Sequence, residues 1–186
     1  MTERDPRLDL PLRTAADTEG DVSRVLGKLE GSGKDLRILR VLANSPGMFR
    51  PFVLMADALL RRSKLPAKER EVVIMHLAAQ RGVPYEWAEH VPMAAEAGVS
   101  DEQLAALSSG TLDDLTLFSP TEQLSLRAAR EIADGALSEA RWNELNDAIG
   151  EGAALDLLLT VAWWGAFVPM IIETVGLVSP APDTGG

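Results

Sequence analysis

The fold is set by residues 66–98, which read PAKEREVVIMHLAAQRGVPYEWAEHVPMAAEAG and contain both histidines of the chain. Apolar residues recur at helical spacing on both sides of Gly82. Gly82 is suited to end the first helix, because glycine adopts the left-handed conformation of a helix C-cap. Pro66 and Pro84 suit first-turn positions, where a missing N–H costs nothing. The segment therefore predicts two helices joined as a hairpin.

The rest of the chain also has helical spacing, and no run shows sustained period-two alternation. Ser100 and Ser119 each begin a capping-box pattern, which marks a helix start. Further helices are expected at about 22–29, 48–61, 101–108, 120–134, 138–149 and 152–176. An all-α fold follows. At 186 residues, a single domain is expected at 18–177, between a flexible N-terminal arm (1–17) and a flexible tail (178–186).

Composition excludes several classes of function. A net charge of −10 opposes binding to phosphate backbones, so no nucleic-acid partner is expected. The chain has no cysteine, which excludes disulfides, thiolate zinc sites and thiol catalysis and fits a reducing compartment. The N-terminal segment is polar and acidic and contains no signal-peptide pattern, so a cytoplasmic location is expected.

One apolar segment resembles a membrane span. It has only 16 residues between Asp156 and Glu173, fewer than the ~20 that a bilayer requires. Gly165 and Pro169 also interrupt it. We interpret it as a buried helix, either in the core or at a subunit interface. No membrane partner is expected.

The candidate catalytic residues are His90, Glu71 and Glu86. Glu86 and His90 are four apart and share a helix face, so they can pair directly. With about 1.5 Å rise per residue, His90 lies about 11 Å and Glu71 about 17 Å from the turn. The gap of about 6 Å suggests an intervening water or substrate, or an offset between the helices. The alternatives are an exposed acid at position 71 and an inert core histidine at position 90.

Four further residues are candidates for substrate binding. Trp87 shares the apolar stripe of His90. Tyr85 supplies a hydroxyl to a substrate or covers the hairpin end. His76 is level with His90 but is rotated about 140° around the helix from Glu71, which favours a surface or interface position.

Trp163, the fourth candidate, belongs to an aromatic group with Trp164 and Phe167. These three are interpreted as core or interface residues, with one lining a pocket as the alternative. No metal is expected, since the chain has neither a His pair at i, i+4 nor a His-Glu-x-x-His pattern.

The hairpin resembles the active-site hairpin of the carboxymuconolactone decarboxylase superfamily, which includes the alkylhydroperoxidase D branch. In the peroxidase branch, a helical Glu is followed by Cys-x-x-Cys and then, four residues later, by His. On that spacing, Glu71 and His90 take the Glu and His positions, while Val83 and Glu86 stand where the cysteines would be. The resemblance is strong over about residues 36–107 and weaker beyond them. Thiol peroxidase activity is excluded, because it needs a thiolate.

The resemblance implies an alkylhydroperoxidase D-like helical bundle that assembles as a homo-oligomer, a trimer or hexamer. It also implies a lyase or isomerase that needs no cofactor and acts on a small organic acid or aromatic-derived metabolite. In that hypothesis His90 is the general acid or base, Glu86 orients it, and Glu71 is a second acid/base group or an electrostatic partner. The alternative is a non-catalytic helical oligomer that serves as a binding or scaffold protein.

Overall fold

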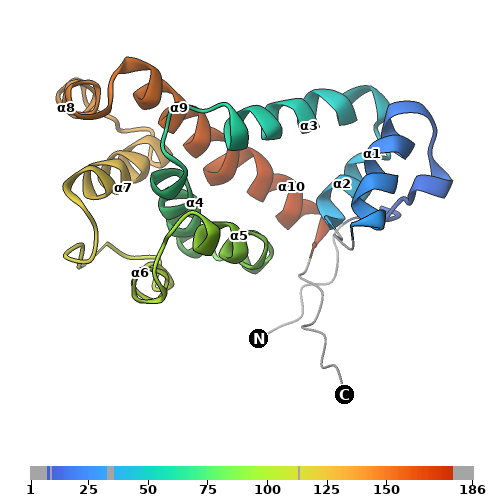
Figure 1. Ribbon diagram of the computed structural model, residues 1–186, viewed down its shortest axis with the longest axis horizontal. Helices are drawn as coiled ribbons and strands as arrows, with labels where there is room; N and C mark the ends of the chain where they lie inside the picture. The colour runs from blue at the N-terminus through green and yellow to red at the C-terminus, as the bar shows by residue number, and fades with distance from the viewer. Residues whose placement is uncertain (1–7, 9, 33–35, 113, 178–186) are drawn as a thin grey trace. The chain divides into compact units, whose positions relative to one another are not determined.

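The computed structural model describes residues 8, 10–32, 36–112 and 114–177, and these ranges contain helices and no strand (Figure 1). The all-α prediction is confirmed. The tail predicted at 178–186 and the beginning of the predicted arm, residues 1–7 and 9, lie outside the described residues. Contacts divide the chain into two compact units.

The first unit comprises the described residues up to Arg62, together with 172–177. It contains the 3₁₀ turn η1 (Ala15–Asp17) and helices α1 (Gly20–Gly31), α2 (Arg37–Leu42) and α3 (Pro46–Arg61). Part of the predicted arm is anchored here, because the N–H of Arg13 donates to the carbonyl oxygen of Arg40 at 3.1 Å. Helix α3 begins at Pro46 rather than at the predicted Met48, since proline fits the first turn of a helix.

The second unit comprises residues 63–171 and contains the predicted hairpin. Its helices are α4 (Ala67–Arg81), α5 (Pro84–Glu96), α6 (Asp101–Leu107), α7 (Pro120–Ala133), α8 (Glu139–Ile149) and α9 (Glu151–Ala162). The π-helical turn η2 (Trp163–Phe167) and the first part of α10 (Val168–Val175) complete it. The predicted helix starts at 101, 120 and 138 agree closely with these bounds.

Helix α4 is central to the second unit. It contacts α5, α6, α7, α9 and the turn η2 (Figure 1). All residues from Arg70 to Ala78 are buried. A helix that is covered on every side has no solvent face on which to place its polar side chains. The three polar residues within this range are therefore removed from water and depend on protein partners.

The hairpin turns at Gly82, which adopts the left-handed conformation with φ +66° and ψ +45°. The N–H of Val83 donates to the carbonyl oxygen of Ala78 at 3.0 Å, and the N–H of Gly82 donates to that of Ala79 at 3.1 Å. This is the Schellman pattern, which satisfies the last carbonyls of a helix. Pro84 then occupies the first turn of α5. The predicted roles of Gly82 and Pro84 are confirmed.

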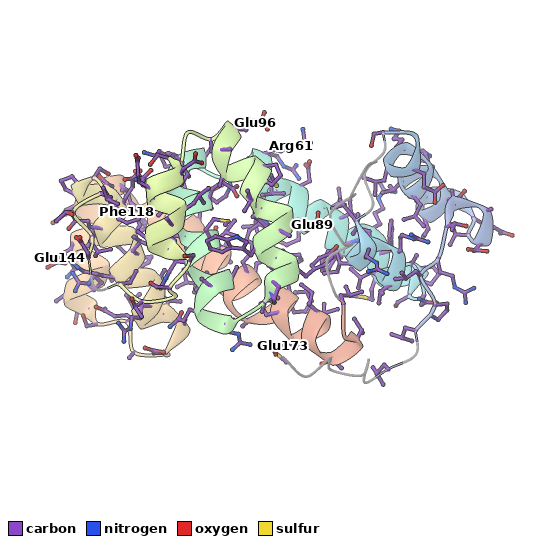
Figure 2. The ribbon with its side chains drawn as sticks, turned by 90° about the horizontal axis from the view of Figure 1, so that it is seen from below. Arg61, Glu89, Glu96, Phe118, Glu144 and Glu173 are labelled. Atoms are coloured by element: carbon purple, nitrogen blue, oxygen red, sulfur yellow. The ribbon has the colours of Figure 1, made fainter. Side chains whose placement is uncertain are left out.

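Helices α6 and α7 begin with serine caps and pack against α4 through an apolar cluster. The Ser100 and Ser119 hydroxyls each accept a hydrogen bond from the N–H three residues later, as the capping-box patterns predict. We call this apolar cluster the α4–α7 cluster, and Phe118, labelled in Figure 2, belongs to it. The buried members of this cluster are Val72, Met75, Ala94, Val99, Leu107, Phe118 and Leu126.

The helix predicted at 152–176 is interrupted by a π-helical turn. The N–H of Val168 donates to the carbonyl oxygen of Trp163, five residues earlier. The next residue, Pro169, has no N–H and cannot continue the regular ladder to Gly165. A π turn at this point is a recognised way to accommodate such an interruption. It changes the direction of the aromatic side chains within it.

Among the described residues, the helical run Glu151–Val175 is long and apolar enough to cross a membrane by length and composition alone. In the most apolar window of that run, 44% of the residues are buried inside the protein. A core helix passes the same length and composition test. Leu155, Phe167 and Met170 are nevertheless exposed at 49%, 49% and 61%.

Replacement of Gly82 tests the hairpin turn. An added Cβ meets nothing within 4 Å, so any loss of stability comes from backbone strain. We expect Gly82→Ala to lower the free energy of unfolding by about 1–2 kcal/mol. Gly82→Asn should cost less, because asparagine tolerates the left-handed region. Urea unfolding followed by tryptophan fluorescence measures this, since all four tryptophans lie in the second unit. Equal stabilities of the three proteins would contradict it.

Candidate functional site

Glu71 of α4 and His90 of α5 are in direct contact. Oε2 of Glu71 lies 2.9 Å from Nδ1 of His90, and the two residues are 1% and 5% exposed. The gap of about 6 Å along the helix axes is closed without an intervening molecule, because the two side chains are long enough to span it. The interpretation of Glu71 as an exposed acid is wrong, since α4 is buried on all sides.

The second oxygen of Glu71 also has a partner. Nε of Arg70 lies 3.3 Å from Oε1 of Glu71, and Arg70 is itself buried. An isolated carboxylate in such a position costs several kcal/mol. The guanidinium of Arg70 and the imidazole of His90 together contact both oxygens of Glu71, so neither oxygen is left without a partner.

Glu86 lies on the other side of the imidazole. Its Oε2 is 3.6 Å from Nε2 of His90, which is longer than a hydrogen bond. Burial raises the pKa of Glu86 to about 7, with a smaller contribution from Glu89, while His90 acts in the opposite direction. Glu86 therefore changes between its acid and its carboxylate forms near neutral pH.

The two contacts of His90 are not equivalent. The contact with Glu71 is a hydrogen bond, in which the carboxylate oxygen accepts from Nδ1–H in the tautomer that carries the proton on Nδ1. In the neutral imidazole this leaves Nε2 as the unprotonated nitrogen, facing Glu86. Of the two acids, Glu71 is within hydrogen-bond distance of the ring, and Glu86 lies beyond that distance on the opposite side.

Trp164 completes the surroundings of His90. The two rings pack edge to face, with centroids 5.6 Å apart and an interplanar angle of 86°. The predicted candidate, Trp163, packs against Phe167 and Trp164, with centroids 5.0 and 6.4 Å away. Both tryptophans lie in the π-helical turn, where side chains are not spaced as in a regular α-helix. Regular helical spacing therefore does not show which of the two contacts His90.

Sequence reasoning missed two members of the site, Trp164 and Arg70. Trp164 belongs to the aromatic group that the sequence predicts, in which Trp163 is the candidate for substrate binding. Arg70 lies in the charged run 68–71, which is typical of a solvated surface. The feature that could have indicated Arg70 is the acid that follows it in an otherwise apolar helix. A buried ionised carboxylate needs a cation as its partner.

Two remaining candidates are covered by other parts of the fold. Trp87 is half-buried and packs against the α4–α7 cluster. Tyr85 is only 1% exposed, so it lies inside the fold at the hairpin end. Of the predicted site residues, the structure thus brings together His90, Glu71 and Glu86, whereas Trp87 belongs to the packing of the apolar cluster.

His76 is not a surface residue, and that expectation is wrong. It is 1% exposed, and neither ring nitrogen has a hydrogen-bond partner within the described part of the chain. Burial lowers the pKa of His76 to about 4, and the charge of Arg130 adds to this effect. The ring is therefore neutral at physiological pH. Its face of α4 differs from that of Glu71, as the spacing of the two residues along the helix predicts.

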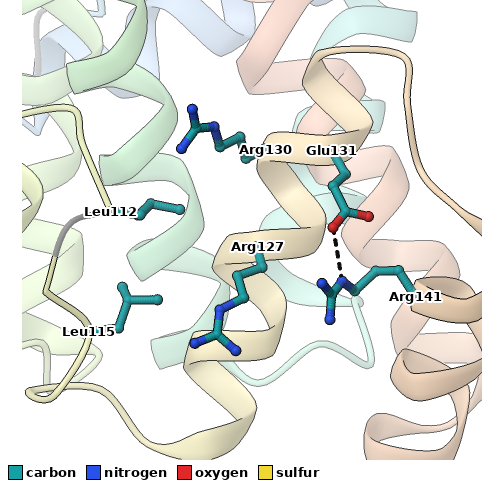
Figure 3. A pocket seen from close by; sticks show the side chains of 6 residues that line it. All are labelled: Leu112, Leu115, Arg127, Arg130, Glu131 and Arg141. Atoms are coloured by element: carbon teal, nitrogen blue, oxygen red, sulfur yellow. Dashed lines mark hydrogen bonds and ion pairs between the residues drawn. The ribbon is translucent and has the colours of Figure 1, made fainter.

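A pocket of about 400 Å³ lies elsewhere in the second unit (Figure 3). Its lining residues are Leu112, Leu115, Arg127, Arg130, Glu131 and Arg141. None of the predicted site residues lines it. Within the described ranges, no group of three or more His, Asp or Glu residues has a metal-binding arrangement.

Comparisons with known proteins agree with this fold. Residues 46–131 match the carboxymuconolactone decarboxylase family. The chain is similar to the alkylhydroperoxidase AhpD core of an uncharacterized peroxidase-related protein from Ralstonia eutropha JMP134, with a TM-score of 0.80 and 20% identity over 95% of this chain and 94% of that one. It is also similar to an uncharacterized peroxidase-related protein from Silicibacter sp. TM1040, with a TM-score of 0.78 and 15% identity over 98% and 95% of the two chains.

A search of curated proteins finds no match. At the identities of the two solved structures, the likeness concerns the fold. The predicted alkylhydroperoxidase D-like helical fold is confirmed, and so is the family resemblance of the hairpin.

The raised pKa of Glu86 predicts a pH dependence of stability. The folded state keeps the Glu86 proton up to about pH 7, whereas the unfolded chain loses it near 4.5. Stability from this group is therefore full below pH 4.5 and falls as pH rises toward 7. We expect Glu86→Gln to gain stability relative to the wild type across that window, by up to about 3 kcal/mol at about 1.36 kcal/mol per pKa unit.

Urea unfolding between pH 4.5 and 8 measures this difference. Glu96→Gln, on an exposed position of the same helix, is the matched control and should follow the wild type at every pH. A constant difference between Glu86→Gln and the wild type over the whole range would contradict the expectation.

Proposed function

Because residues 46–131 match the carboxymuconolactone decarboxylase family, we propose that this chain is an enzyme that performs acid/base chemistry on a small organic molecule. The reaction class is decarboxylation, isomerisation or lactone chemistry on an organic acid or an aromatic-derived metabolite. The supporting observation is the buried row Glu71–His90–Glu86, in which one carboxylate orients the imidazole and another titrates near pH 7.

Such a row suits proton transfer at carbon. In a decarboxylation, the bond to the departing CO₂ breaks and its electron pair remains on the substrate carbon as a carbanion or enolate. A proton must then reach that carbon. The His90–Glu86 pair holds one such proton near neutral pH and delivers it, and solvent replaces it after release of the product. A group with a pKa near the working pH is the most effective donor.

The other residues of the site support this transfer. Glu71, held by Arg70, fixes the tautomer and the orientation of the imidazole. Trp164 packs edge-on against the ring and limits its rotation. Burial lowers the local dielectric constant and strengthens each electrostatic contact. The chemistry uses side chains alone, so the proposal includes no cofactor and no metal.

Thiol peroxidase chemistry has no place in this proposal, because the chain has no cysteine. The two similar solved structures are described as peroxidase-related. We do not extend that description to this chain. A cytoplasmic location and a small-molecule substrate remain part of the proposal.

The second candidate function is a non-catalytic helical oligomer that acts as a binding or scaffold protein. The observation that favours it is the position of the pocket, whose lining does not include His90. A substrate reaches His90 only if the side chains around it move. The two candidates differ in their requirement for His90, which makes them separable by substitution.

Turnover of a metabolite that copurifies with the protein tests the enzyme proposal. We expect His90→Gln to lower kcat/KM by about 10²-fold or more, as for a general acid or base. Glu71→Gln should lower kcat by weakening the orientation of the ring, and Glu96→Gln should leave it unchanged. The wild-type rate should fall above about pH 7, where Glu86 loses its proton. Full activity of His90→Gln would support the scaffold function.

Oligomer formation is proposed for either function. Large apolar side chains are exposed along the C-terminal helical run, and monomers rarely leave such surfaces uncovered. The family resemblance implies a trimer or hexamer. Light scattering should give a multiple of the 20.0 kDa chain mass. Leu155→Glu with Met170→Glu should yield the monomer, whereas Lys28→Glu, at an exposed site on α1, should not. A wild-type mass equal to that of one chain would contradict the proposal.

A further inference from the structure

The pocket beside α7 has a chemistry that the proposed function does not use. It lies between the segment that carries Leu112 and Leu115 and the helices α7 and α8 (Figure 3). Its volume of about 400 Å³ lies within the range of small-molecule sites, roughly 300–1,000 Å³. Three arginines and one glutamate line it, so it is a basic hollow on a chain of net charge −10.

The three arginines differ in how their charge is compensated. Arg141 is bound by two acids, since its Nε lies 3.0 Å from Glu131 and its Nη1 pairs with Glu144. Arg127 has one weak partner, the neutral side-chain oxygen of Gln123 at 3.4 Å. Within the described part of the chain, the guanidinium of Arg130 makes no hydrogen bond or ion pair. Two positive charges in the pocket thus have no paired carboxylate.

These two charges have the geometry of a carboxylate site. Arg127 and Arg130 are three residues apart on α7, so they share one face of that helix. A guanidinium presents its N–H groups in a planar fork that matches a carboxylate and binds it with two parallel hydrogen bonds. Both side chains are exposed at the pocket, which leaves them free to reorient around a ligand.

The opposite wall is apolar. The side chains of Leu112 and Leu115 point from their loop toward α7 (Figure 3), and both residues pack in part on the α4–α7 cluster. An apolar ligand gains binding free energy by covering this apolar surface and excluding water from it. A fully hydrated ion makes no such contact and gains nothing from it. The two walls together select a molecule with a charged head and an apolar body.

We propose that this pocket is a binding site for a small organic carboxylate, with Arg127 and Arg130 holding the carboxylate and Leu112 and Leu115 covering its apolar body. The site is distinct from the row Glu71–His90–Glu86 and does not rest on the proposed function. Loss of turnover in a His90 variant leaves the pocket intact, and loss of pocket binding leaves the row intact.

Calorimetric titration of the full chain with benzoate tests the site. We expect saturable binding of one benzoate per chain, no binding of the neutral benzamide, and weaker binding of inorganic phosphate. Arg127→Gln and Arg130→Gln should each weaken benzoate binding at least about tenfold, because each removes a charge-assisted hydrogen bond. Arg61→Gln removes the same charge from an exposed arginine that does not line the pocket, and it should bind as the wild type does.

Two results would overturn the proposal. Absence of saturable benzoate binding, or equal binding by the two arginine variants and the wild type, would show that the pocket is not a carboxylate site. Phosphate that binds as tightly as benzoate would show a site that reads charge alone, without the leucine wall. Both substituted arginines are exposed, so the variants should fold, and their circular dichroism checks this.

Histidine signals locate the bound molecule, because the chain has only two histidines. His76 lies close enough to Arg130 for its charge to act on the ring. Benzoate bound at Arg130 should therefore shift the ring resonances of His76, with His90 unchanged. The spectrum of His90→Gln assigns the two signals. A shift of His90 alone would place benzoate at the other site and overturn the assignment to the pocket.

Discussion

The structure depends on the burial of the central part of helix α4, residues 70–78. A helix covered on all sides must either pair its charged groups or keep its titratable groups neutral. Both outcomes occur on this one helix. Glu71 is partnered on both oxygens, by Arg70 and by His90 of α5. His76, which has no partner among the described residues, stays neutral because burial lowers its pKa to about 4. The same constraint therefore fixes the hairpin and sets the surroundings of its two histidines.

The surroundings of His90 include a residue that stands in place of a thiol. By the family resemblance, Glu86 occupies the position of the second cysteine in the peroxidase branch. In this fold that position is adjacent to Nε2 of His90, at 3.6 Å. A carboxyl there cannot perform thiol redox steps, but a buried one titrates near pH 7. With Val83 and Glu86 in the two cysteine positions, the hairpin carries a titratable carboxyl where the peroxidase branch carries a thiol.

The two polar regions of the second unit follow opposite electrostatic principles. The row Glu71–His90–Glu86 is buried, and both oxygens of Glu71 have partners. The low dielectric constant and the fixed geometry strengthen its electrostatic contacts. The pocket at α7 is open, and two of its three arginines, Arg127 and Arg130, have no paired acid among the described residues, so their charge is available to a ligand. The π turn serves the first region, because it brings Trp164 against the imidazole.

The amino-acid sequence by itself determined the helices, the hairpin turn at Gly82, the serine caps and the closeness of Glu86 to His90, because each depends on residues close together in the chain. Only the tertiary structure decided the rest. The contact of Glu71 with His90, the packing of Trp164 on the imidazole and the burial of His76 depend on how separate helices pack. Local spacing gives the face of a helix on which a side chain lies, but the neighbouring helices decide whether that face meets water, a partner or an apolar wall.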